Sequence, residues 1–249
     1  MSRHETPLAA VVMAAGLGTR MRSKLPKHLH PLLGRRMVDW VIGAAQDAGV
    51  TRVVVVASPD TRGLFDGLDV AVQEQALGTG DAVRSARDAL AGFSGDVLVL
   101  NGDVPALTAE TVRALLDTHA TAGAAGTVLS FEPADSRRYG RIVRDAAGDF
   151  QAIVEERDAT PDQRRITEVN MSCYLFDCRE LLAALGKIGR HNAQGEYYLT
   201  DCPGILQAEG KRVEALPVLQ PCEALSINTL DELVVVEHEL RQKHLGQKN

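Results

Sequence analysis

The sequence predicts an α/β protein built on a doubly wound, mostly parallel mixed sheet of the Rossmann-like type, with a smaller β lobe beside it. Residues 8–15 form a continuous apolar run that opens onto glycines, as expected for a central strand buried on both faces. Strand and helix patterns then alternate as far as about residue 122, which is typical of parallel sheets. Residues 126–176 carry mostly strand patterns, and these predict the second lobe.

Each expected element follows from a local pattern. Segments with strand character bounded by turn residues predict strands at residues 52–57, 68–73, 96–100, 126–131, 141–144, 150–155, 169–176 and 213–219. Residues 79–90 carry apolar side chains at helical spacing. Thr108 is suited to cap a helix that runs through His119. Thr229 and Glu232 form the capping-box pattern of a C-terminal helix over about residues 229–244.

The 249 residues contain no Pro-rich or Ser-rich linker and no repeat, so we expect a single domain over residues 1–249. Within it we expect one lobe over about residues 1–125 and a second lobe over about residues 126–228, before the C-terminal helix. Ligands of doubly wound sheets bind beyond the carboxyl ends of the strands. That rule predicts Gly16, Gln73 and Asp103 along one rim.

Composition excludes several classes of protein. Hydrophobic residues make up 45% of the chain and charged residues 24%, as in ordinary globular proteins, while 4% aromatic residues offer little for stacking on bases. We therefore expect no nucleic-acid partner. No apolar run approaches the roughly 18 residues that span a bilayer, and the N-terminus lacks a signal-peptide pattern, which predicts no membrane partner and a cytoplasmic location. The four cysteines form no CxxC pair, which argues against a zinc site.

Residues 6–38 form a basic block in an acidic chain. They include six Lys/Arg, two His and no Asp or Glu, although the whole chain has a formal net charge of −6. A positive field confined to one short segment suits a small bound anion, whereas nucleic acid would favour a long basic face.

The loop at residues 16–21, Gly-Leu-Gly-Thr-Arg-Met, begins like the dinucleotide fingerprint GxGxxG, but Met21 stands where the third glycine belongs. The first acidic residue after it, Asp39, lies in a helix-like stretch rather than at the end of a second strand, which disfavours an NAD site. The Walker pattern GxxxxGK[ST] is also missing from this loop.

A phosphate-binding role for this loop remains. Glycines allow backbone N–H groups to approach phosphate oxygens, and Arg20 and Lys27 add positive charge. Pro26 restricts the backbone directly before Lys27, so the ammonium group comes from a constrained segment.

Seven motifs occur in a fixed order along the chain. They are AAGLGTRMRSKLPKHLHPL from Ala14, Gln73 with LGTG at 77–80, NGDVP at 101–105, YGRI at 139–142, IVE at 153–155, EVN at 168–170, and NAQGEYYLTD at 192–201. With these motifs, from about residue 8 to 240, the chain resembles the uridyltransferase (pyrophosphorylase) domain of the bacterial bifunctional N-acetylglucosamine-1-phosphate uridyltransferases.

The resemblance implies a nucleotide-sugar pyrophosphorylase fold, a Mg²⁺ cofactor and small-molecule substrates. It makes residues 1–125 the nucleotide-binding lobe and residues 126–228 the sugar-binding lobe. UTP and a sugar 1-phosphate, in the first place N-acetylglucosamine 1-phosphate, would give a UDP-sugar and pyrophosphate. The alternatives are another hexose 1-phosphate, another nucleotide such as CTP or dTTP, and a non-catalytic subunit that binds nucleotide sugars. The LGTG loop with Gln73 favours UTP over the other nucleotides but does not exclude them.

The resemblance also implies roles for individual residues. The catalytic residues would be Arg20, Lys27 and Asp103. The nucleotide would contact Ala14, Ala15, Gly16, Gly18, Thr19, Gln73, Gly78 and Thr79. The sugar would contact Gly140, Glu155 and Asn170, and Mg²⁺ would be held by Asp103 and Asn228. Asp103 ends an apolar strand, and carboxylate and amide oxygens are the hard ligands that Mg²⁺ prefers.

Two features differ from that family. Asn170-Met171-Ser172 stands where the family has Asn-Thr-Gly or Asn-Ser-Gly, so we expect this segment to reshape the sugar pocket and to decide which sugar is used. The hexapeptide repeats of the family's acetyltransferase β-helix are also missing from the sequence. We therefore expect no acetyltransferase activity, and a monomer or a weak homodimer in place of a trimer.

Overall fold

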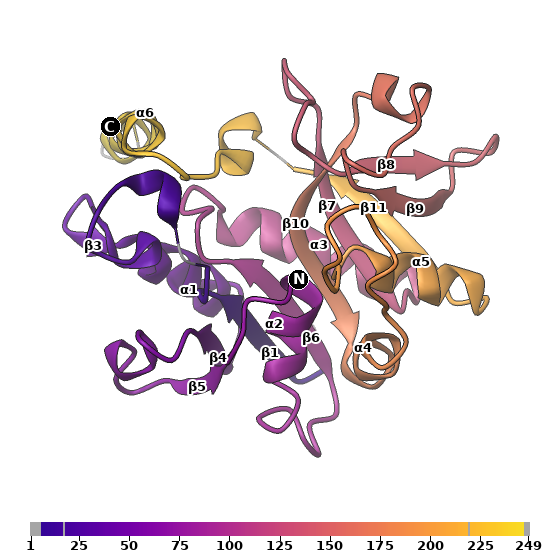
Figure 1. The fold of residues 1–249 in the computed structure, drawn as a ribbon, viewed down its shortest axis with the longest axis horizontal. Helices are drawn as coiled ribbons and strands as arrows, with labels where there is room; N and C mark the ends of the chain where they lie inside the picture. The colour runs from indigo at the N-terminus through magenta and orange to yellow at the C-terminus, as the bar shows by residue number, and fades with distance from the viewer. Residues whose placement is uncertain (1–5, 17, 219, 247–249) are drawn as a thin grey trace.

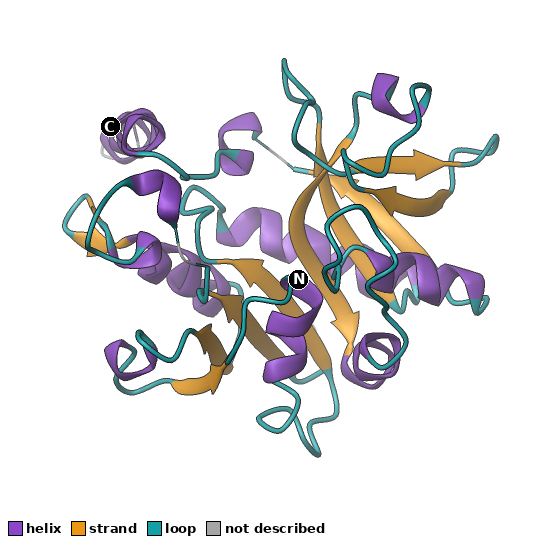
Figure 2. Cartoon of the chain, in the orientation of Figure 1, coloured by secondary structure: helices purple, strands orange, loops and turns teal. Residues whose placement is uncertain are grey.

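The computed structural model describes residues 6–16, 18–218 and 220–246. One nine-stranded sheet runs through the molecule, with helices on both of its faces (Figures 1 and 2). Its main path has the strand order β11-β7-β10-β6-β1-β4-β5. The strands of this path are β1 (Leu8–Met13), β4 (Arg52–Ala57), β5 (Asp69–Val72), β6 (Asp96–Asn101), β7 (Gly126–Phe131), β10 (Val169–Asp177) and β11 (Val213–Pro217).

The first half of the sheet is parallel. β1 pairs with β4 on one side and with β6 on the other, and β5 extends the sheet beyond β4. All six residues of β1 are buried, as the uninterrupted apolar run predicts. The chain leaves β1 toward one edge and later returns to its other side, so a topological switch point lies at the carboxyl ends of β1 and β6.

The second half is mixed. β10 runs antiparallel to both β6 and β7, while β11 is parallel to β7. A hairpin of β8 (Arg141–Arg144) and β9 (Phe150–Val154) branches from β10. A second, two-stranded sheet joins β2 (Pro31–Leu32) to β3 (Arg35–Arg36). The doubly wound, mostly parallel mixed sheet predicted from the sequence is confirmed.

Six α-helices are described. They are α1 (Met37–Asp47), α2 (Thr79–Ser85), α3 (Ala109–Ala122), α4 (Cys178–Leu185), α5 (Asp201–Ala208) and α6 (Leu230–Gly246). One apolar cluster joins the sheet to α2, α4 and α5, and a second joins the opposite face to α1 and α3. Short 3₁₀ helices occupy Thr19–Met21, Lys27–Leu29, Arg62–Leu64, Gln163–Arg165 and Pro221–Ala224.

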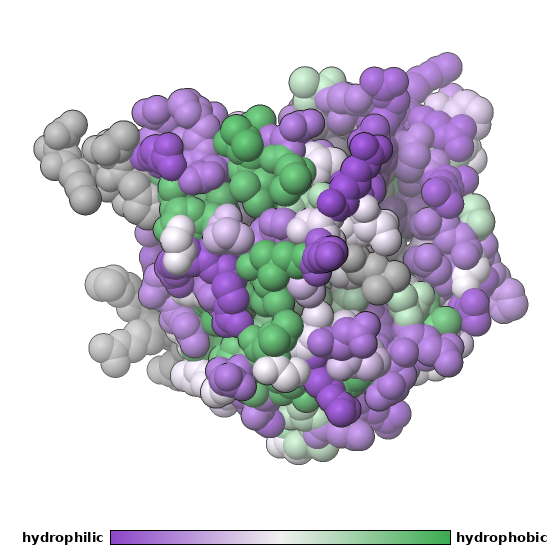
Figure 3. All heavy atoms as spheres, turned by 60° about the vertical axis from the view of Figure 1, so that its left-hand side comes forward, coloured by the Kyte–Doolittle hydropathy of each residue, from purple (hydrophilic) through white to green (hydrophobic). Residues whose placement is uncertain are grey.

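α6 packs on the rest of the molecule by one side. Val236 and Leu240 are buried in a small third cluster with Met21 and Ile227. The face that carries α6 also shows apolar surface (Figure 3), and Val234 of this helix is 64% exposed. No helix in the described ranges has both the length and the apolar character needed to cross a membrane.

The expected elements agree with the structure closely, with shifts at some ends. The predicted helix over 79–90 is shorter, because α2 ends at Ser85 and the chain continues in hydrogen-bonded turns to Leu90. Strand β11 ends at Pro217, and residue 219 of the predicted strand lies outside the described residues. Thr108 caps α3 by accepting a hydrogen bond from the Thr111 amide, as predicted.

Candidate active site

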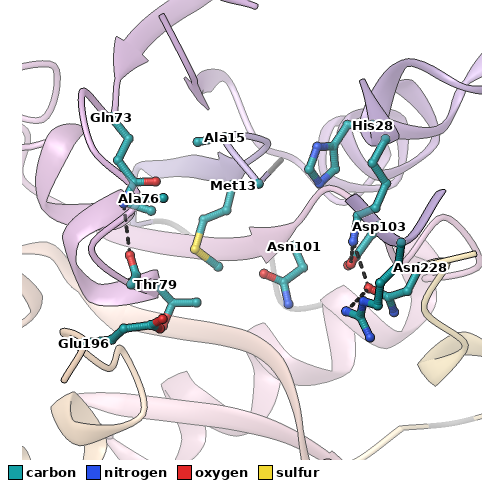
Figure 4. Close-up of a pocket in the computed structure, with 15 residues that line it drawn as sticks. Met13, Ala15, His28, Gln73, Ala76, Thr79, Asn101, Asp103, Glu196 and Asn228 are labelled. Carbon is teal, nitrogen blue, oxygen red and sulfur yellow. Dashed lines mark hydrogen bonds and ion pairs between the residues drawn. The ribbon is translucent and has the colours of Figure 1, made fainter. Parts of the chain in front are cut away.

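A cavity of about 370 Å³ opens at the carboxyl ends of β1, β5 and β6. Its lining residues include Met13, Ala15, Gly16, Arg20, Lys27, His28, Gln73, Gly78, Thr79, Asn101, Asp103, Glu196 and Asn228. Figure 4 shows Gln73 and Thr79 at one end and Asp103 and Asn228 at the other, with Met13 and Asn101 between them. The topology therefore brings the first three groups of sequence motifs, together with Asn228, into one hollow.

A group of cations and oxygen ligands occupies one end of this cavity. The Lys27 ammonium Nζ donates to Asp103 Oδ2 at 2.5 Å and to Asn228 Oδ1 at 3.0 Å. Arg20 Nη2 donates to the same Asn228 oxygen at 2.9 Å. The Ile227 amide donates to the Asp103 carbonyl at 2.9 Å, which holds the segment before Asn228 against the end of β6. Four residues from three distant segments are thus in direct contact.

The glycine loop packs closely against Lys27. Gly18 has a φ of 59°, and a Cβ added there would lie 2.5 Å from the Cβ of Lys27, so only glycine fits this turn. Ala14 is buried and its amide donates to Val56 O, while Thr19 begins a 3₁₀ helix beside the cavity. Leu17 lies outside the described residues. The loop and the Lys27 backbone therefore pack as one compact unit.

His28 lies beneath the loop and was given no role in the sequence analysis. A Cβ added at Gly102 would lie 3.0 Å from its Cδ2, and one added at Gly16 would lie 3.7 Å from its Cε1, so the ring fills the space between these two glycines. Burial, aided by the charge of Lys27 and opposed by that of Asp103, lowers the pKa of His28 to about 4. The imidazole is therefore neutral at neutral pH.

The residues at this end fit a divalent cation of the magnesium type. Asp103 Oδ1 is buried and has no hydrogen-bond partner among the described residues, so one carboxylate oxygen is available to a ligand. The described part of the chain has no cluster of three or more His, Cys, Asp or Glu suited to a metal ion. Mg²⁺ needs no such cluster, since it is commonly bound by one or two protein oxygens together with waters and substrate phosphates.

Gln73, Gly78 and Thr79 form the opposite end. Gln73 Nε2 donates to Gly78 O at 3.1 Å and to Asp81 Oδ2 at 2.9 Å, so both amide hydrogens are used within the protein and Oε1 remains as an acceptor. The Thr79 hydroxyl accepts from the Leu199 amide at 3.1 Å. This end of the cavity therefore offers Gln73 Oε1 as a hydrogen-bond acceptor, and hydrogen bonds hold the neighbouring loop at Gly78 and Thr79 in place.

The predicted sugar-binding residues lie together outside the lining of this cavity. The backbone N–H of Asn170 donates to Gly140 O at 2.8 Å. A Cβ added at Gly140 would lie 3.5 Å from Glu155 Oε2. Thr200 donates its hydroxyl to Glu155 Oε1 at 2.9 Å. Burial raises the pKa of Glu155, and nearby Asp158 adds to this, although the Thr200 hydrogen bond opposes it.

The segment that differs from the resembled family divides between the two faces of the sheet. Met171 is buried in the apolar cluster that faces α1 and α3. Tyr174 belongs to the cluster on the opposite face, the face that also contains Ile153 beside Glu155. Met171 therefore packs on the other face of the sheet from the predicted sugar residues, and the expectation that the segment reshapes the sugar pocket does not hold for this residue. Of the two residues that differ from the family, Met171 and Ser172, only Ser172 can then change the sugar pocket.

Several residues of the site were not found by sequence reasoning. Asn101, His28 and Glu196 line the cavity, and Thr200 bonds to Glu155. Each of them stands inside a motif that the sequence analysis singled out, but only His28 is next to a residue that was given a role. Position within a motif was the available signal, but which side chains face the cavity depends on local backbone direction.

Comparisons with known proteins agree with this geometry. A family model of the MobA-like NTP transferase domain matches residues 10–198. The chain is 45% identical over 242 residues to the bifunctional protein GlmU of Pelotomaculum thermopropionicum, covering 96% of this chain and 53% of that protein. It is 46% identical to GlmU of Geobacter metallireducens, covering 95% and 51%. The chain thus spans about half the length of these curated relatives.

A solved structure of similar fold is a UDP-glucose pyrophosphorylase complexed with UDP-glucose. The match covers 95% of this chain and 99% of that one with a TM-score of 0.76. Sequence identity is 16%, so this similarity establishes the fold alone.

Proposed function

The chain belongs to the family of MobA-like NTP transferase domains, and on this premise we propose that it is a sugar-1-phosphate uridyltransferase. It joins UTP to N-acetylglucosamine 1-phosphate and releases UDP-N-acetylglucosamine and pyrophosphate. The observation that carries the proposal is the single cavity in which Arg20, Lys27 and Asp103 lie opposite Gln73. A cationic end and an acceptor end within one cavity suit the phosphates and the base of a nucleoside triphosphate.

The proposed reaction exchanges one phosphoanhydride for another. An oxygen of the sugar phosphate attacks the α-phosphorus of UTP, and the bond from this phosphorus to the bridging oxygen breaks. Pyrophosphate leaves with the electron pair of that bond. No covalent enzyme intermediate is needed, so catalysis consists of aligning two anions and neutralising the charge that develops on the leaving group.

The cations of the site carry out most of this work. Arg20 and Lys27 contact Asn228 and Asp103 in the structure and have the reach to stabilise phosphate oxygens instead, with Arg20 on the pyrophosphate and Lys27 on the α-phosphate and sugar phosphate. Asp103 and Asn228 would hold Mg²⁺, which supplies further charge neutralisation when bound. Backbone N–H groups of residues 15, 16, 18 and 19 complete the phosphate site, while the N–H of Ala14 is not among them because it donates to Val56 O.

Base and sugar are recognised at separate places. Gln73 Oε1 accepts a hydrogen bond from an N–H group of the base, and Gly78 and Thr79 lie beside it. In uracil the donor is the N3–H group. Glu155 accepts from sugar hydroxyls through the oxygen next to Gly140. We accordingly assign the nucleotide to residues 1–125 and the sugar to residues 126–228, in a protein that is a monomer or weak homodimer.

The test is pyrophosphate release measured for UTP, CTP and dTTP against N-acetylglucosamine 1-phosphate and glucose 1-phosphate. We expect the highest kcat/KM for UTP with N-acetylglucosamine 1-phosphate. Turnover with CTP and none with UTP on either sugar phosphate would contradict the uridyl assignment. Binding of UDP-N-acetylglucosamine without turnover for any pair would instead identify a non-catalytic nucleotide-sugar-binding subunit.

A further inference from the structure

The bulge in β10 beside the proposed sugar site contains an unusual backbone conformation. The pairing register between β10 and β7 shifts between Asn170 and Tyr174. Within this bulge, Ser172 has a φ of 59°. The left-handed region is unfavourable for a residue with a Cβ, and such outliers are retained where the surroundings hold them. Ser172 is thus kept in place at an energetic cost.

Hydrogen bonds inside the bulge fix Ser172. Its amide donates to Asn170 Oδ1 at 2.9 Å. Asn170 Nδ2 in turn donates to the Tyr174 hydroxyl at 2.7 Å and, more weakly, to Ser172 Oγ at 3.4 Å. Asn170 and Tyr174 are 3% and 1% exposed, so this network lies in the interior. The bulge therefore has a single arrangement, set by the buried amide of Asn170.

This network limits what Asn170 can offer a ligand. Both hydrogens of its amide are directed to neighbours in the bulge, and one lone pair of Oδ1 accepts from Ser172 N. Ser172 is half-buried, in contrast to Asn170, and its Oγ serves as an acceptor for Asn170. The Ser172 hydroxyl also interacts with the buried Tyr174 hydroxyl, and an oxygen acceptor of a ligand would take the place of this internal partner.

Ser172 also lies on the side of the sheet where the other sugar-binding residues gather. Met171 and Cys173, its neighbours in sequence, both pack in the cluster facing α1 and α3. Tyr174 packs in the cluster on the opposite face, with Ile153 of β9. Glu155 follows directly after β9 and contributes to the charge that acts on the Tyr174 hydroxyl. Alternation along the strand places Ser172 with Tyr174 on the face of Glu155.

From these contacts we infer that Ser172 is a specificity-determining residue for the sugar 1-phosphate, whose hydroxyl donates a hydrogen bond to an oxygen acceptor of the bound sugar. The inference rests on the proposed function, because it concerns the sugar that this function requires. In this segment, the Ser172 hydroxyl, and not Met171 or the side-chain amide of Asn170, is then the source of sugar selectivity.

Two substitutions separate the hydroxyl group from the backbone conformation. Ser172→Ala removes the hydroxyl and keeps the Cβ, whereas Ser172→Gly removes both and suits a φ of 59°. We expect both variants to raise the KM for the preferred sugar 1-phosphate about three- to tenfold, the usual effect of one neutral hydrogen bond. The ratio of kcat/KM between N-acetylglucosamine 1-phosphate and glucose 1-phosphate should change, while the KM for UTP stays within about twofold.

The thermal unfolding of Ser172→Gly serves as the control for folding, because this substitution relieves the unfavourable φ. A folded Ser172→Gly protein with the wild-type KM and the wild-type sugar ratio would overturn the inference. A change in the KM for UTP equal to that for the sugar would overturn it too, since that result indicates a general disturbance. Absence of uridyl transfer in the wild-type protein is a different outcome, and it would refute the proposed function itself.

Discussion

Lys27 and Asp103 are 76 positions apart in the sequence, and their side chains meet at 2.5 Å in the cavity. The two side chains are 10% and 14% exposed, so each charge depends on its partner or on a ligand for stabilisation. Under the proposed function, phosphate oxygens and a divalent cation would take the place of these internal contacts. At the scale of single residues, the site is a set of opposite charges that stabilise each other within the protein.

Asp103→Asn tests the carboxylate. The substitution keeps the shape of the side chain and removes the charge that would hold a divalent cation, so we expect kcat to fall by at least about 10²-fold. Pyrophosphate release measured over a range of Mg²⁺ concentrations checks this, with circular dichroism as the control for folding. A variant that retains activity within about threefold of wild type would remove Asp103 from the mechanism.

His28 gives a pH dependence of stability. Its folded pKa of about 4 lies below the ordinary value of 6.5, so between these values the unfolded chain takes up a proton that the folded protein does not. Stability therefore falls as the pH is lowered through this window. Between pH 7 and pH 5 we expect His28 to cost about 2 kcal/mol of unfolding free energy.

The measurement is urea unfolding of wild type and His28→Leu at pH 7 and pH 5. Comparing each protein with itself at pH 7 cancels the change in packing that the substitution causes. Between pH 7 and pH 5, the unfolding free energy of the variant should fall by about 2 kcal/mol less than that of wild type. Equal losses would show that His28 does not remain neutral when the protein is folded.

At the scale of elements, the loop before α2 is held by the segment that precedes α5. Gly80 N donates to Tyr197 O and Tyr197 N donates to Leu77 O, both at 2.8 Å. Gly78 has a φ of 118°, and a Cβ there would lie 2.4 Å from Tyr197 O. The LGTG loop keeps its shape because another backbone is in contact with it.

Gly78→Ala should therefore be costly. A clash with backbone combined with an unfavourable φ predicts a loss of about 2 kcal/mol or more in unfolding free energy, and a higher KM for UTP. Gly204→Ala is the matched control, because Gly204 lies within α5 with open space around its Cα and should gain about 0.5–1 kcal/mol. The unfolding curves of the two variants are recorded side by side. Equal shifts would contradict the claim that a Cβ at position 78 is excluded by the backbone of Tyr197.

Local patterns were sufficient for most elements. The Thr229 and Glu232 capping box forms as predicted, with reciprocal hydrogen bonds of 3.0 and 3.2 Å. The Glu232 carboxylate also accepts from the Asn228 amide at 2.7 Å, so the cap helps to position a proposed metal ligand. That second role was not predictable, since the pattern of a cap contains no information about what its preceding residue contacts.

At the scale of the whole molecule, Glu223 joins two distant segments. It is fully buried and accepts hydrogen bonds from the hydroxyls of Thr108 and Thr111 at the start of α3. The same chain segment continues to Ile227, whose amide bonds to the Asp103 carbonyl. This link fixes the C-terminal part of the chain against the core of the sheet.

Glu223→Ala should lower the unfolding free energy by about 2–4 kcal/mol, because the buried Thr111 hydroxyl and the partly buried Thr108 hydroxyl lose their acceptor. Glu237→Ala, which breaks a surface pair with Arg241, is the control and should cost no more than about 0.5 kcal/mol. Chemical denaturation of both variants checks the difference. Similar losses for the two would mean that Glu223 contributes no more than a surface charge.

The sequence by itself determined the strands, the capped helices, the glycine loop and the cationic block, since these depend on backbone preferences and on neighbours a few residues apart. Tertiary structure alone decided that Lys27 meets both Asp103 and Asn228, and that Met171 faces the core while Ser172 bonds to Asn170, a predicted sugar-binding residue. Strand order and the bulge in β10 set those contacts. Both arise from packing between segments that a local pattern does not describe.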